Sequence, residues 1–344
     1  MKELLDRFYR ESEYPALVKQ AAEWAKSRPL AGLKVLDATP LFRNTLTKYV
    51  ALISAGAELS VAVNPDIPFD RGTAEFVERC GIRVMKTPST GFDLVLDCAG
   101  CNAAVESKFG YVELTRSGEY RYAGCAKPVL SADASRIKEI ETVLGTGDGW
   151  RRAMIETGHG DFSGKKVVIF GCGKVGRGIA MYAAREGAAV TMIDDPGRVK
   201  FPSFAVPVDM HSPTAVEQAV AGAWCVISVT GVRNAWCGKF DPAALLASDS
   251  LIVNMGVEDE FGPAVPADRV LNRKRPLNFM LEEPTKLKYI EATLALHNAA
   301  AVLLAGGGFP PGISKIPAEV EREILNCSIS AGEIGDEIRE LEKL

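Results

Sequence analysis

The segment from Lys165 to Ala180, KKVVIFGCGKVGRGIA, constrains the fold of this chain most strongly. An apolar run, predicted to be a buried strand, leads directly into Gly171-x-Gly173-x-x-Gly176 and then into a predicted helix. In this context the first glycine permits a tight turn, the second lets the backbone approach a pyrophosphate, and the third lets the helix pack on the strand. A helix N-terminus also presents free N–H groups to phosphate oxygens. The segment therefore predicts a dinucleotide site in a parallel α/β domain.

A carboxylate ends the strand expected to lie beside this loop. Asp194 closes the apolar run AAVTMIDD, 18 residues after Gly176. A carboxylate at that place can accept hydrogen bonds from both hydroxyls of an adenosine ribose and would repel a 2′-phosphate. The pattern favours NAD over NADP, although the nearby Arg198 would favour the phosphate. A glycine turn that binds nothing is the alternative interpretation.

Short apolar runs alternate with helix-like segments along the whole chain. Continuous apolar strands between helices are typical of a parallel sheet covered on both faces. One series of runs begins at Lys34, Leu59, Ile82 and Leu94, and the second begins at Val167, Val190, Cys225 and Leu251. The sequence predicts an α/β fold of two Rossmann-like, doubly wound parallel-sheet domains with a cleft between them.

The break between the two series sets the predicted domain boundaries. Residues 1–130 form a predicted substrate or catalytic domain, completed by C-terminal helices within 284–344, and residues 151–283 form the predicted NAD-binding domain. Residues 131–150 lie between them as a predicted hinge. Around it, residues 132–154 are expected to form a polar helix, a glycine turn and the start of a second helix.

Composition and charge exclude several classes of partner. Apolar residues make up 47% of the chain and charged residues 24%, as in a soluble globular protein. The formal net charge is −4 and no Lys/Arg run stands out, so nucleic acid is not an expected partner. The apolar stretch from Tyr289 to Leu304 is short for a bilayer span and is predicted to be a buried helix, so no membrane association is expected. Eight scattered cysteines favour reduced thiols in a cytoplasmic protein over a disulfide framework.

Several segments resemble those of one enzyme family. VELTRSG resembles E-E-T-T-T-G, DASRIKEIETVLGTG resembles a hinge that shares its GTG, GCGKVGRG matches G-x-G-x-V-G-K-G, and SVTG and VNMG resemble T-T-T-G and C-N-I-G. With the opening ESEYPALVKQAAEWAKSRPLAGLKV and with GAELSVAVNP, they make the chain resemble S-adenosylhomocysteine hydrolase over nearly its whole length.

The resemblance implies bound NAD. The residues expected to hold it are Gly171, Gly173, Lys174, Val175, Gly176 and Asp194, with Thr115, Ser117, Thr142, Thr230, Gly231, Met255 and Gly256 toward the nicotinamide side. The resemblance also implies self-association, and we expect a homodimer or a higher homo-oligomer.

The acid–base positions of that family are mostly occupied by other residues here. The family oxidises a ribose 3′-hydroxyl with its NAD, eliminates or adds a thiol and reduces the ketone again, which requires acids and bases around the sugar. By the resemblance, Pro40, Val257 and Glu283 replace histidines, Cys98 replaces an aspartate, and Ile137 replaces a lysine. The family's C-terminal tail is missing after RELEKL. We therefore expect that this protein does not hydrolyse S-adenosylhomocysteine.

Glu141, Lys138 and Glu283 are the candidate catalytic acids and bases. Glu141 takes the place of a hinge aspartate and Lys138 could assist it. The alternative for this pair is a solvated i, i+3 salt bridge on an exposed helix. Glu283 and its neighbour Glu282 precede Pro284, where the alternative is compensation of a helix dipole.

Candidate substrate-binding residues lie at the end of the first predicted strand. Thr39, Arg43 and Asn44 follow Asp37 there, and parallel sheets bind ligands at such strand ends. Arg43 could clamp a carboxylate or a phosphate, which suits an anionic substrate. Glu113 is a further candidate, for which a surface strand residue is the alternative.

The cysteine and histidine pattern gives no strong metal signal. Cys98-Ala-Gly-Cys101 and Cys125 lack a second pair or histidines at suitable spacing, so no metal is expected. A redox pair and close packing of small residues at strand ends are the alternatives. His297, in an otherwise apolar helix, is predicted to be a hydrogen-bonded core histidine.

Three functions are compatible with these patterns. The first is an NAD-dependent oxidoreductase that acts on an unidentified small molecule, either anionic or nucleoside-like. The second is a non-catalytic, NAD-binding regulatory relative of the hydrolase. The third is a group-transfer enzyme that uses an adenosyl ligand, with Asp194 binding the ribose of that ligand.

Overall fold

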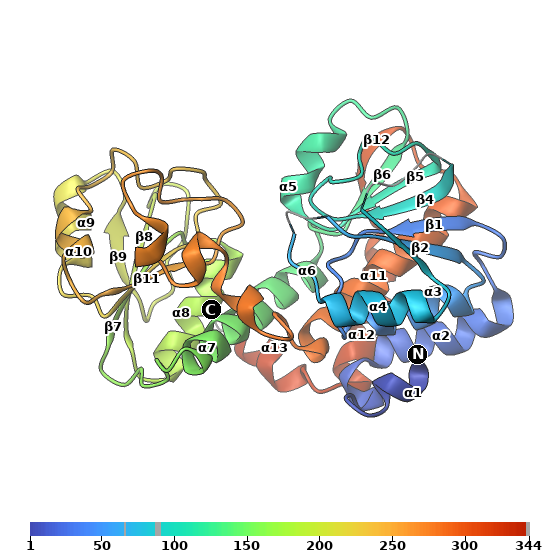
Figure 1. The fold of residues 1–344 in the computed structure, drawn as a ribbon, viewed down its shortest axis with the longest axis horizontal. Helices are drawn as coiled ribbons and strands as arrows, with labels where there is room; N and C mark the ends of the chain where they lie inside the picture. The colour runs from blue at the N-terminus through green and yellow to red at the C-terminus, as the bar shows by residue number, and fades with distance from the viewer. Residues whose placement is uncertain (65–66, 87–90, 342–344) are drawn as a thin grey trace. The chain divides into compact units, whose positions relative to one another are not determined.

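Two compact units make up the part of the chain that the computed structural model describes, residues 1–64, 67–86 and 91–341 (Figure 1). The first unit comprises Met1–Glu141 and Lys286–Arg339, and the second comprises Thr142–Thr285 with Glu340 and Leu341. The first division, between Glu141 and Thr142, falls among the residues predicted to form a hinge. The last three residues of RELEKL lie outside the described residues.

The first unit contains a seven-stranded parallel sheet. Its strands are β1 (Lys34–Asp37), β2 (Glu58–Ala62), β3 (Arg83–Met85), β4 (Phe92–Asp97), β5 (Ser107–Glu113), β6 (Pro128–Ser131) and β12 (Gly312–Lys315), in the order β12-β6-β5-β4-β1-β2-β3. The central strands β1 and β4 are buried along most of their length, so the apolar runs predicted to be strands lie in the core.

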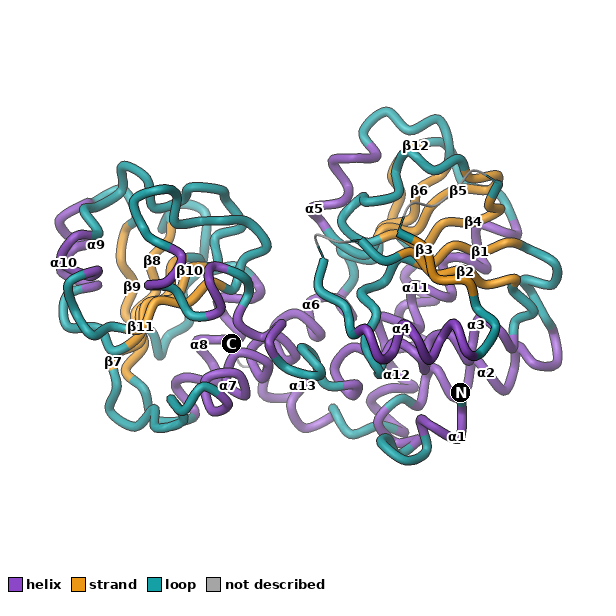
Figure 2. Tube along the Cα trace, in the orientation of Figure 1, coloured by secondary structure: helices purple, strands orange, loops and turns teal. Residues whose placement is uncertain are grey.

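Helices cover the faces of this sheet, and α2, α3, α11 and α12 pack against one another (Figures 1 and 2). The helices of this unit are α1 (Lys2–Leu5), α2 (Pro15–Ser27), α3 (Thr45–Ser54), α4 (Arg71–Arg79), α5 (Arg116–Glu119), α6 (Arg136–Ile140), α11 (Leu287–Gly306) and α12 (Ala318–Ala331), and α13 (Gly335–Leu341) follows. Short 3-10 turns lie at Glu11–Glu13 and Tyr120–Tyr122.

Helix α11 is the central helix of the first unit. It packs against β4, β5, α2, α3 and α12. Its length and composition would allow it to cross a membrane, but two-thirds (67%) of its most apolar window is buried inside the protein. The prediction of a buried helix at Tyr289–Leu304 is confirmed.

The second unit contains a five-stranded parallel sheet. Its strands are β7 (Lys166–Phe170), β8 (Ala189–Asp194), β9 (Val206–Asp209), β10 (Cys225–Ser228) and β11 (Leu251–Asn254), in the order β11-β10-β7-β8-β9. Its helices are α7 (Thr146–Glu156), α8 (Lys174–Arg185), α9 (Pro213–Val220) and α10 (Ala243–Leu246), with 3-10 turns at Ala267–Arg269, Asn272–Lys274 and Leu277–Met280. Phe170 and Phe240 stack in its core, and the ring of Trp236 packs against both at a tilt.

Both sheets share one strand order, which confirms the predicted doubly wound fold. In each, the third, second, first, fourth and fifth strands of the unit lie side by side in that order. The direction of winding reverses between the first and fourth strands, β1 and β4 in one unit and β7 and β10 in the other. Ligands of such sheets bind beyond the carboxyl ends of the strands at this reversal.

The predicted glycine turn after the polar helix is wrong. Helix α6 is followed by a π-helical turn at Glu141–Gly145 and then directly by α7. The glycines of GTGDG serve close packing instead. A Cβ on Gly147 would lie 2.7 Å from the carbonyl oxygen of Gly178 in α8, and one on Gly149 would lie 2.4 Å from that of Pro284. Helix α7 therefore needs small residues on the faces that contact α8 and the 284 segment.

Candidate functional site

The glycine loop after β7 is shaped by backbone contacts. Gly171 has φ +108° and a Cβ there would lie 2.5 Å from the carbonyl oxygen of Val229. A Cβ on Gly176 would lie 2.0 Å from the carbonyl oxygen of Gly171, so α8 packs on the loop without room for a side chain. Gly173 differs, because no described atom lies within 4 Å of its Cβ position. Gly173 is the N-cap of α8 and no side chain caps the helix, so Lys174, Val175 and Gly176 begin it.

Asp194, at the end of β8, is hydrogen-bonded to the glycine loop. Its Oδ2 accepts a hydrogen bond from the Cys172 backbone N–H at 2.5 Å, and its Oδ1 accepts one from the Asp195 N–H at 2.7 Å. An ionised carboxylate has about four acceptor positions, so two are left for ribose hydroxyls. Arg198, considered as a partner for a 2′-phosphate, lies with its Nε 3.2 Å from Asp195.

The carboxyl edge of β10 and β11 is organised by Glu260, which the sequence analysis missed. Its fully buried carboxylate accepts hydrogen bonds from the Ser228 hydroxyl, from the Thr230 N–H and hydroxyl, and from the Gly231 N–H. A Cβ on Gly256 would lie 2.1 Å from its Oε1. The carboxylate thus holds together the strand ends that contain Thr230 and Gly256.

Four side chains form a buried network at the end of β1 in the first unit. Lys48 donates from Nζ to Asp37, to the Thr39 hydroxyl at 2.7 Å and to His297 Nδ1 at 2.9 Å. Asp37, Lys48 and His297 have no exposed surface. The three acceptors match the three N–H donors of an ammonium group, so the network is complete with Lys48 charged.

The network fixes the tautomer and the ionisation of His297. Its Nε2 lies 3.0 Å from the Val112 carbonyl oxygen and donates to it, which leaves Nδ1 as the acceptor for Lys48. Burial, and then the charge of Lys48, hold the pKa of His297 well below its usual 6.5. His297 is therefore neutral, as expected of a hydrogen-bonded core histidine.

Two buried carboxylates lie at the ends of β4 and β5. Asp97 accepts from the Tyr122 hydroxyl at 2.6 Å and from the Asn102 amide at 2.8 Å. Glu113 accepts from the N–H groups of Ala99 and Gly100, both at 3.0 Å. Burial, and then the charge of Asp97, raise the pKa of Glu113 to about 7. The interpretation of Glu113 as a surface residue is wrong, because it has no exposed surface.

Lys138 and Glu141 form a buried ion pair, with Nζ 2.9 and 2.8 Å from the two carboxylate oxygens. Both residues are less than a tenth exposed, so the alternative of a solvated salt bridge is wrong. Burial alone would lower the pKa of Lys138, but the charge of Glu141 and its hydrogen bond, together with the charges of Cys98 and Asp133, outweigh burial and the pKa is raised. Burial raises the pKa of the Cys98 thiol well above its usual value, and the charges of Glu113 and Lys138 also act on it. The pair therefore lies close to the strand-end carboxylates.

The remaining predicted residues occupy separate places. The guanidinium of Arg43 lies 3.8 Å from the ring centre of Phe8, and Asn44 is buried directly before α3. Glu283 belongs to the second unit, where its carbonyl oxygen accepts a hydrogen bond from Arg152. The first turn of α11 carries no acidic residue, so the interpretation of Glu282 and Glu283 as compensating its dipole is wrong.

The residues expected near the nicotinamide divide between the units. Thr115 caps α5 in the first unit, and its hydroxyl lies 3.2 Å from that of Ser117. Thr142, Thr230, Gly231, Met255 and Gly256 belong to the second unit. Only the last four lie at the β10–β11 edge.

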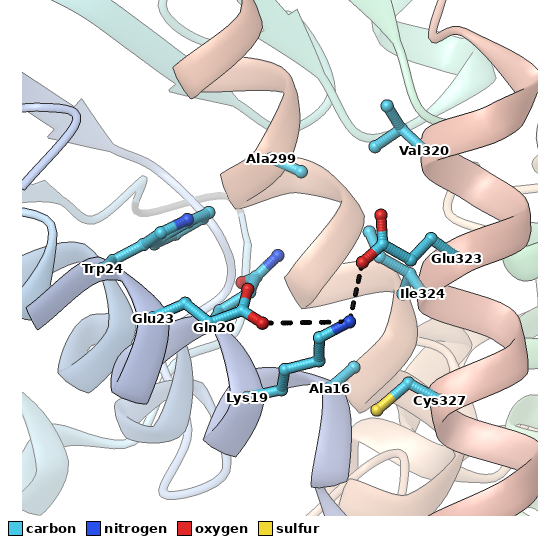
Figure 3. Close-up of a pocket in the computed structure, with 10 residues that line it drawn as sticks. All are labelled: Ala16, Lys19, Gln20, Glu23, Trp24, Ala299, Val320, Glu323, Ile324 and Cys327. Atoms are coloured by element: carbon cyan, nitrogen blue, oxygen red, sulfur yellow. Dashed lines mark hydrogen bonds and ion pairs between the residues drawn. The ribbon is translucent and has the colours of Figure 1, made fainter. Parts of the chain in front are cut away.

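Two pockets lie within the first unit. One of about 130 Å³ lies between α2, α11 and α12, where Lys19 bridges Glu23 and Glu323 (Figure 3). A smaller pocket at the ends of β1 and β2 is lined by Thr39, Asn64 and Cys101, among others. All eight cysteines are unpaired, and no metal-binding group of His, Cys, Asp or Glu occurs in residues 1–64, 67–86 and 91–341.

Comparison with known proteins relates the whole chain to the enzymes that its motifs resemble. No protein-family model matches it. It is 24% identical to adenosylhomocysteinase of Gloeobacter violaceus over 379 residues, covering 93% of this chain and 87% of that protein. It is 25% identical to S-inosyl-L-homocysteine hydrolase of Methanopyrus kandleri, covering 95% and 89%. Among solved structures, a dipicolinate synthase chain from Bacillus halodurans aligns over 98% of its own length with 80% of this one, at 13% identity and a TM-score of 0.47. The chain is a divergent relative of the adenosylhomocysteinases.

Proposed function

We propose that the protein is an NAD-dependent oxidoreductase that acts on a small hydroxylated molecule and does not hydrolyse S-adenosylhomocysteine. The open space over Gly173 carries this proposal. It lies at the uncapped N-terminus of the twelve-residue helix α8, whose first N–H groups suit a pyrophosphate. Asp194, beside the loop, has acceptor capacity for the adenosine ribose.

The chain's own residues fit such a cofactor. Gly171, Gly173, Lys174, Val175 and Gly176 would hold the pyrophosphate. Asp194 would hold the ribose, and the β10–β11 edge with Thr230, Gly231, Met255 and Gly256 would take the nicotinamide half. NAD, when bound, accepts hydride from a carbon that bears a hydroxyl.

The first unit would supply the groups that bind the substrate and accept its hydroxyl proton. Lys138 and Glu141 are a neutral buried pair, so a proton taken up by Glu141 would leave Lys138 charged and able to stabilise an oxyanion. Glu113, with its pKa raised to about 7 by burial, is poised to exchange a proton near neutral pH. Thr39, Arg43 and Asn44 remain proposed contacts for an anionic substrate, and Glu283 remains a proposed acid or base.

A second function is favoured by one observation. The strand-end groups of the first unit are buried and hydrogen-bonded to one another, as in the Lys48 network and in the four donors around Glu113. Such saturation would suit a regulatory protein that binds NAD without oxidising a substrate. The two functions differ in whether the bound cofactor is ever reduced.

The test is mass spectrometry of small molecules released from purified, untreated protein. Near-stoichiometric NAD with some NADH supports the oxidoreductase, and oxidised NAD alone supports the regulatory protein. An adenosyl ligand without NAD would point to group transfer and contradict both. The variant Gly173→Ala should lose the NAD while remaining folded.

A second assay tests the excluded activity. Purified protein is incubated with S-adenosylhomocysteine, and free homocysteine thiol is titrated. We expect no thiol above the blank. Stoichiometric or catalytic release would contradict the proposal that this activity is lost.

A further inference from the structure

The backbone N–H groups of the strand-end segment Val229–Val232 are all hydrogen-bonded within the protein, and Glu260 accepts two of them. Its carboxylate takes the N–H of Thr230 at 2.8 Å, the Thr230 hydroxyl at 2.9 Å and the N–H of Gly231 at 2.7 Å. The next N–H, of Val232, donates to the Thr230 hydroxyl oxygen at 3.1 Å. The N–H of Val229 donates to Phe170 within the sheet. Four consecutive N–H groups are therefore already hydrogen-bonded within the protein.

The neighbouring strand end shows the same pattern. The N–H of Met255 donates to the carbonyl oxygen of Ser228, and the N–H of Gly256 donates to Asn254 Oδ1 at 3.0 Å. The N–H groups of these six residues are thus already bonded, which leaves their carbonyl oxygens as the backbone groups that they can offer to a ligand. Since carbonyl oxygens only accept hydrogen bonds, a ligand group that bonds to the backbone of these six residues must bring donors.

The β10–β11 edge and the glycine loop favour ligand groups of opposite charge. At the α8 N-terminus the helix presents N–H donors and partial positive charge, which suit an anion. At the β10–β11 edge, the buried Glu260 carboxylate takes the N–H donors of Thr230 and Gly231 and carries a negative charge, so an anion bound beside it would be repelled. The second unit therefore has a donor end and an acceptor end.

We propose that Glu260 is a specificity-determining residue that makes the β10–β11 edge select a carboxamide over a carboxylate on the bound dinucleotide. The inference rests on the proposed NAD site. A nicotinamide ring carries an amide NH₂ that can donate to the edge, whereas a nicotinic acid ring carries a carboxylate with no donor. The two dinucleotides, NAD and nicotinic acid adenine dinucleotide, are otherwise identical.

The experiment measures binding of three probes to the full chain by isothermal titration calorimetry. These are NAD, nicotinic acid adenine dinucleotide, and ADP-ribose, which lacks the ring. Protein freed of cofactor by mild chaotrope and refolding is used. We expect the nicotinic acid form to bind at least about tenfold more weakly than NAD, since an unpaired charged group costs that much or more.

Variants assign the preference to Glu260. Glu260→Gln keeps the shape but removes the charge and turns an NH₂ toward one of the loop N–H groups. It should reduce the preference to about threefold or less and leave ADP-ribose affinity within about twofold. A purely structural role would weaken all three probes together. Glu258→Gln is the matched control: Glu258 lies in the same loop, pairs with exposed Arg233, and should leave the preference unchanged.

The outcomes separate the two proposals. If the wild-type protein binds NAD and nicotinic acid adenine dinucleotide equally well, the role of Glu260 is overturned while the NAD site remains supported. The same conclusion follows if the Glu260→Gln variant keeps the tenfold preference. Wild-type protein that binds neither NAD nor ADP-ribose overturns the NAD site and the inference with it. If Glu260→Gln does not fold, the wild-type comparison still decides.

Discussion

At the residue scale, Gly176 is expected to matter for the stability of the second unit, and Gly173 for the binding of NAD. A methyl group on Gly176 would lie 2.0 Å from a backbone oxygen that cannot move aside, whereas one on Gly173 meets no described atom within 4 Å. We expect Gly176→Ala to destabilise the second unit by at least about 2 kcal/mol, as backbone overpacking does. Gly173→Ala should unfold at the wild-type temperature but lose at least tenfold in NAD affinity. Thermal unfolding measures the stability of the two variants, and titration calorimetry measures their NAD affinity. If Gly173→Ala and Gly176→Ala lost the same amount of stability, the proposed difference between the two glycines would be contradicted.

His297 makes stability depend on pH in a predictable direction. Its pKa is held well below 6.5 in the folded protein, so the unfolded chain takes up a proton first as the pH falls. The stabilisation is therefore complete above pH 6.5 and is lost below it, by up to about 1.4 kcal/mol per pH unit. The variant His297→Gln can keep both hydrogen bonds and does not titrate.

Urea unfolding at pH 7.5, 6.5 and 5.5 tests this. The free energy of unfolding of the wild type should fall more steeply with acid than that of His297→Gln. The raised pKa values of Glu113 and Glu291 act in the opposite direction, but they are common to both proteins and cancel in the difference. Parallel pH profiles would show that His297 is not the titrating group.

Site residues that belong to a local sequence pattern could be predicted from the sequence. Site residues whose burial or bonding depends on partners far away in the chain could not. The glycine loop and Asp194 are recognisable because their spacing along the chain is itself the signal. Lys48 resembles a surface lysine in TLTKYVALIS, and its burial depends on Asp37 and on His297, which is 249 residues away. Glu260 gives only a weak signal, a carboxylate beside Phe261 in the loop that follows β11.

At the scale of elements, the contact between α11 and α12 contains a buried acid. Glu291 of α11 accepts a hydrogen bond from the Ser328 hydroxyl of α12, and burial raises its pKa from 4.5 to about 7. Because the folded state favours the protonated form, stability is full below pH 4.5 and is lost as the pH rises to 7. That loss amounts to roughly 2 to 3 kcal/mol.

Glu291→Gln should therefore stabilise the protein at pH 8 by about 2 kcal/mol and have little effect at pH 4.5. Chemical unfolding at the two pH values measures the difference. Glu323→Gln on α12 is a suitable control, because Glu323 is exposed and pairs only with Lys19 across the pocket of Figure 3 (expected change within about 0.5 kcal/mol). A gain independent of pH would contradict the assignment.

Strands with a continuous apolar run were predictable, and strands without one were not, whatever their length. The eight predicted runs correspond to β1, β2, β3, β4, β7, β8, β10 and β11. Four strands, β5, β6, β9 and β12, were not predicted. The apolar residues of β5 (SKFGYVE) are interrupted by Lys108 and Gly110, β6 has only two central apolar residues, and β9 and β12 are largely exposed at sheet edges. The pairing of β6 with β12 joins Gly312 to Pro128, and such a long-range contact leaves no periodicity in the sequence.

At the scale of the molecule, tryptophan fluorescence can follow the unfolding of the second unit separately, because three of the four tryptophans lie in that unit. Trp150, Trp224 and Trp236 lie in the second unit and Trp24 lies in the first. NAD at one hundred times its dissociation constant stabilises the unit that binds it by about 2.7 kcal/mol. We expect NAD to raise the unfolding midpoint of the fluorescence of Trp24→Phe by roughly 5 °C or more. An unchanged midpoint at saturating NAD would contradict cofactor binding by the second unit.

The second unit interrupts the first, and this has a consequence for synthesis on the ribosome. Residues 142–285 emerge before α11, α12 and β12, yet α11 is the helix that covers β4 and β5. Domains fold as units while the chain grows. The first six strands of the N-terminal sheet, β1 to β6, must therefore wait, with an apolar face exposed, for a helix translated about 150 residues later. We expect the nascent chain to complete its dinucleotide-binding unit first and to depend on chaperones until residue 306 has left the exit tunnel.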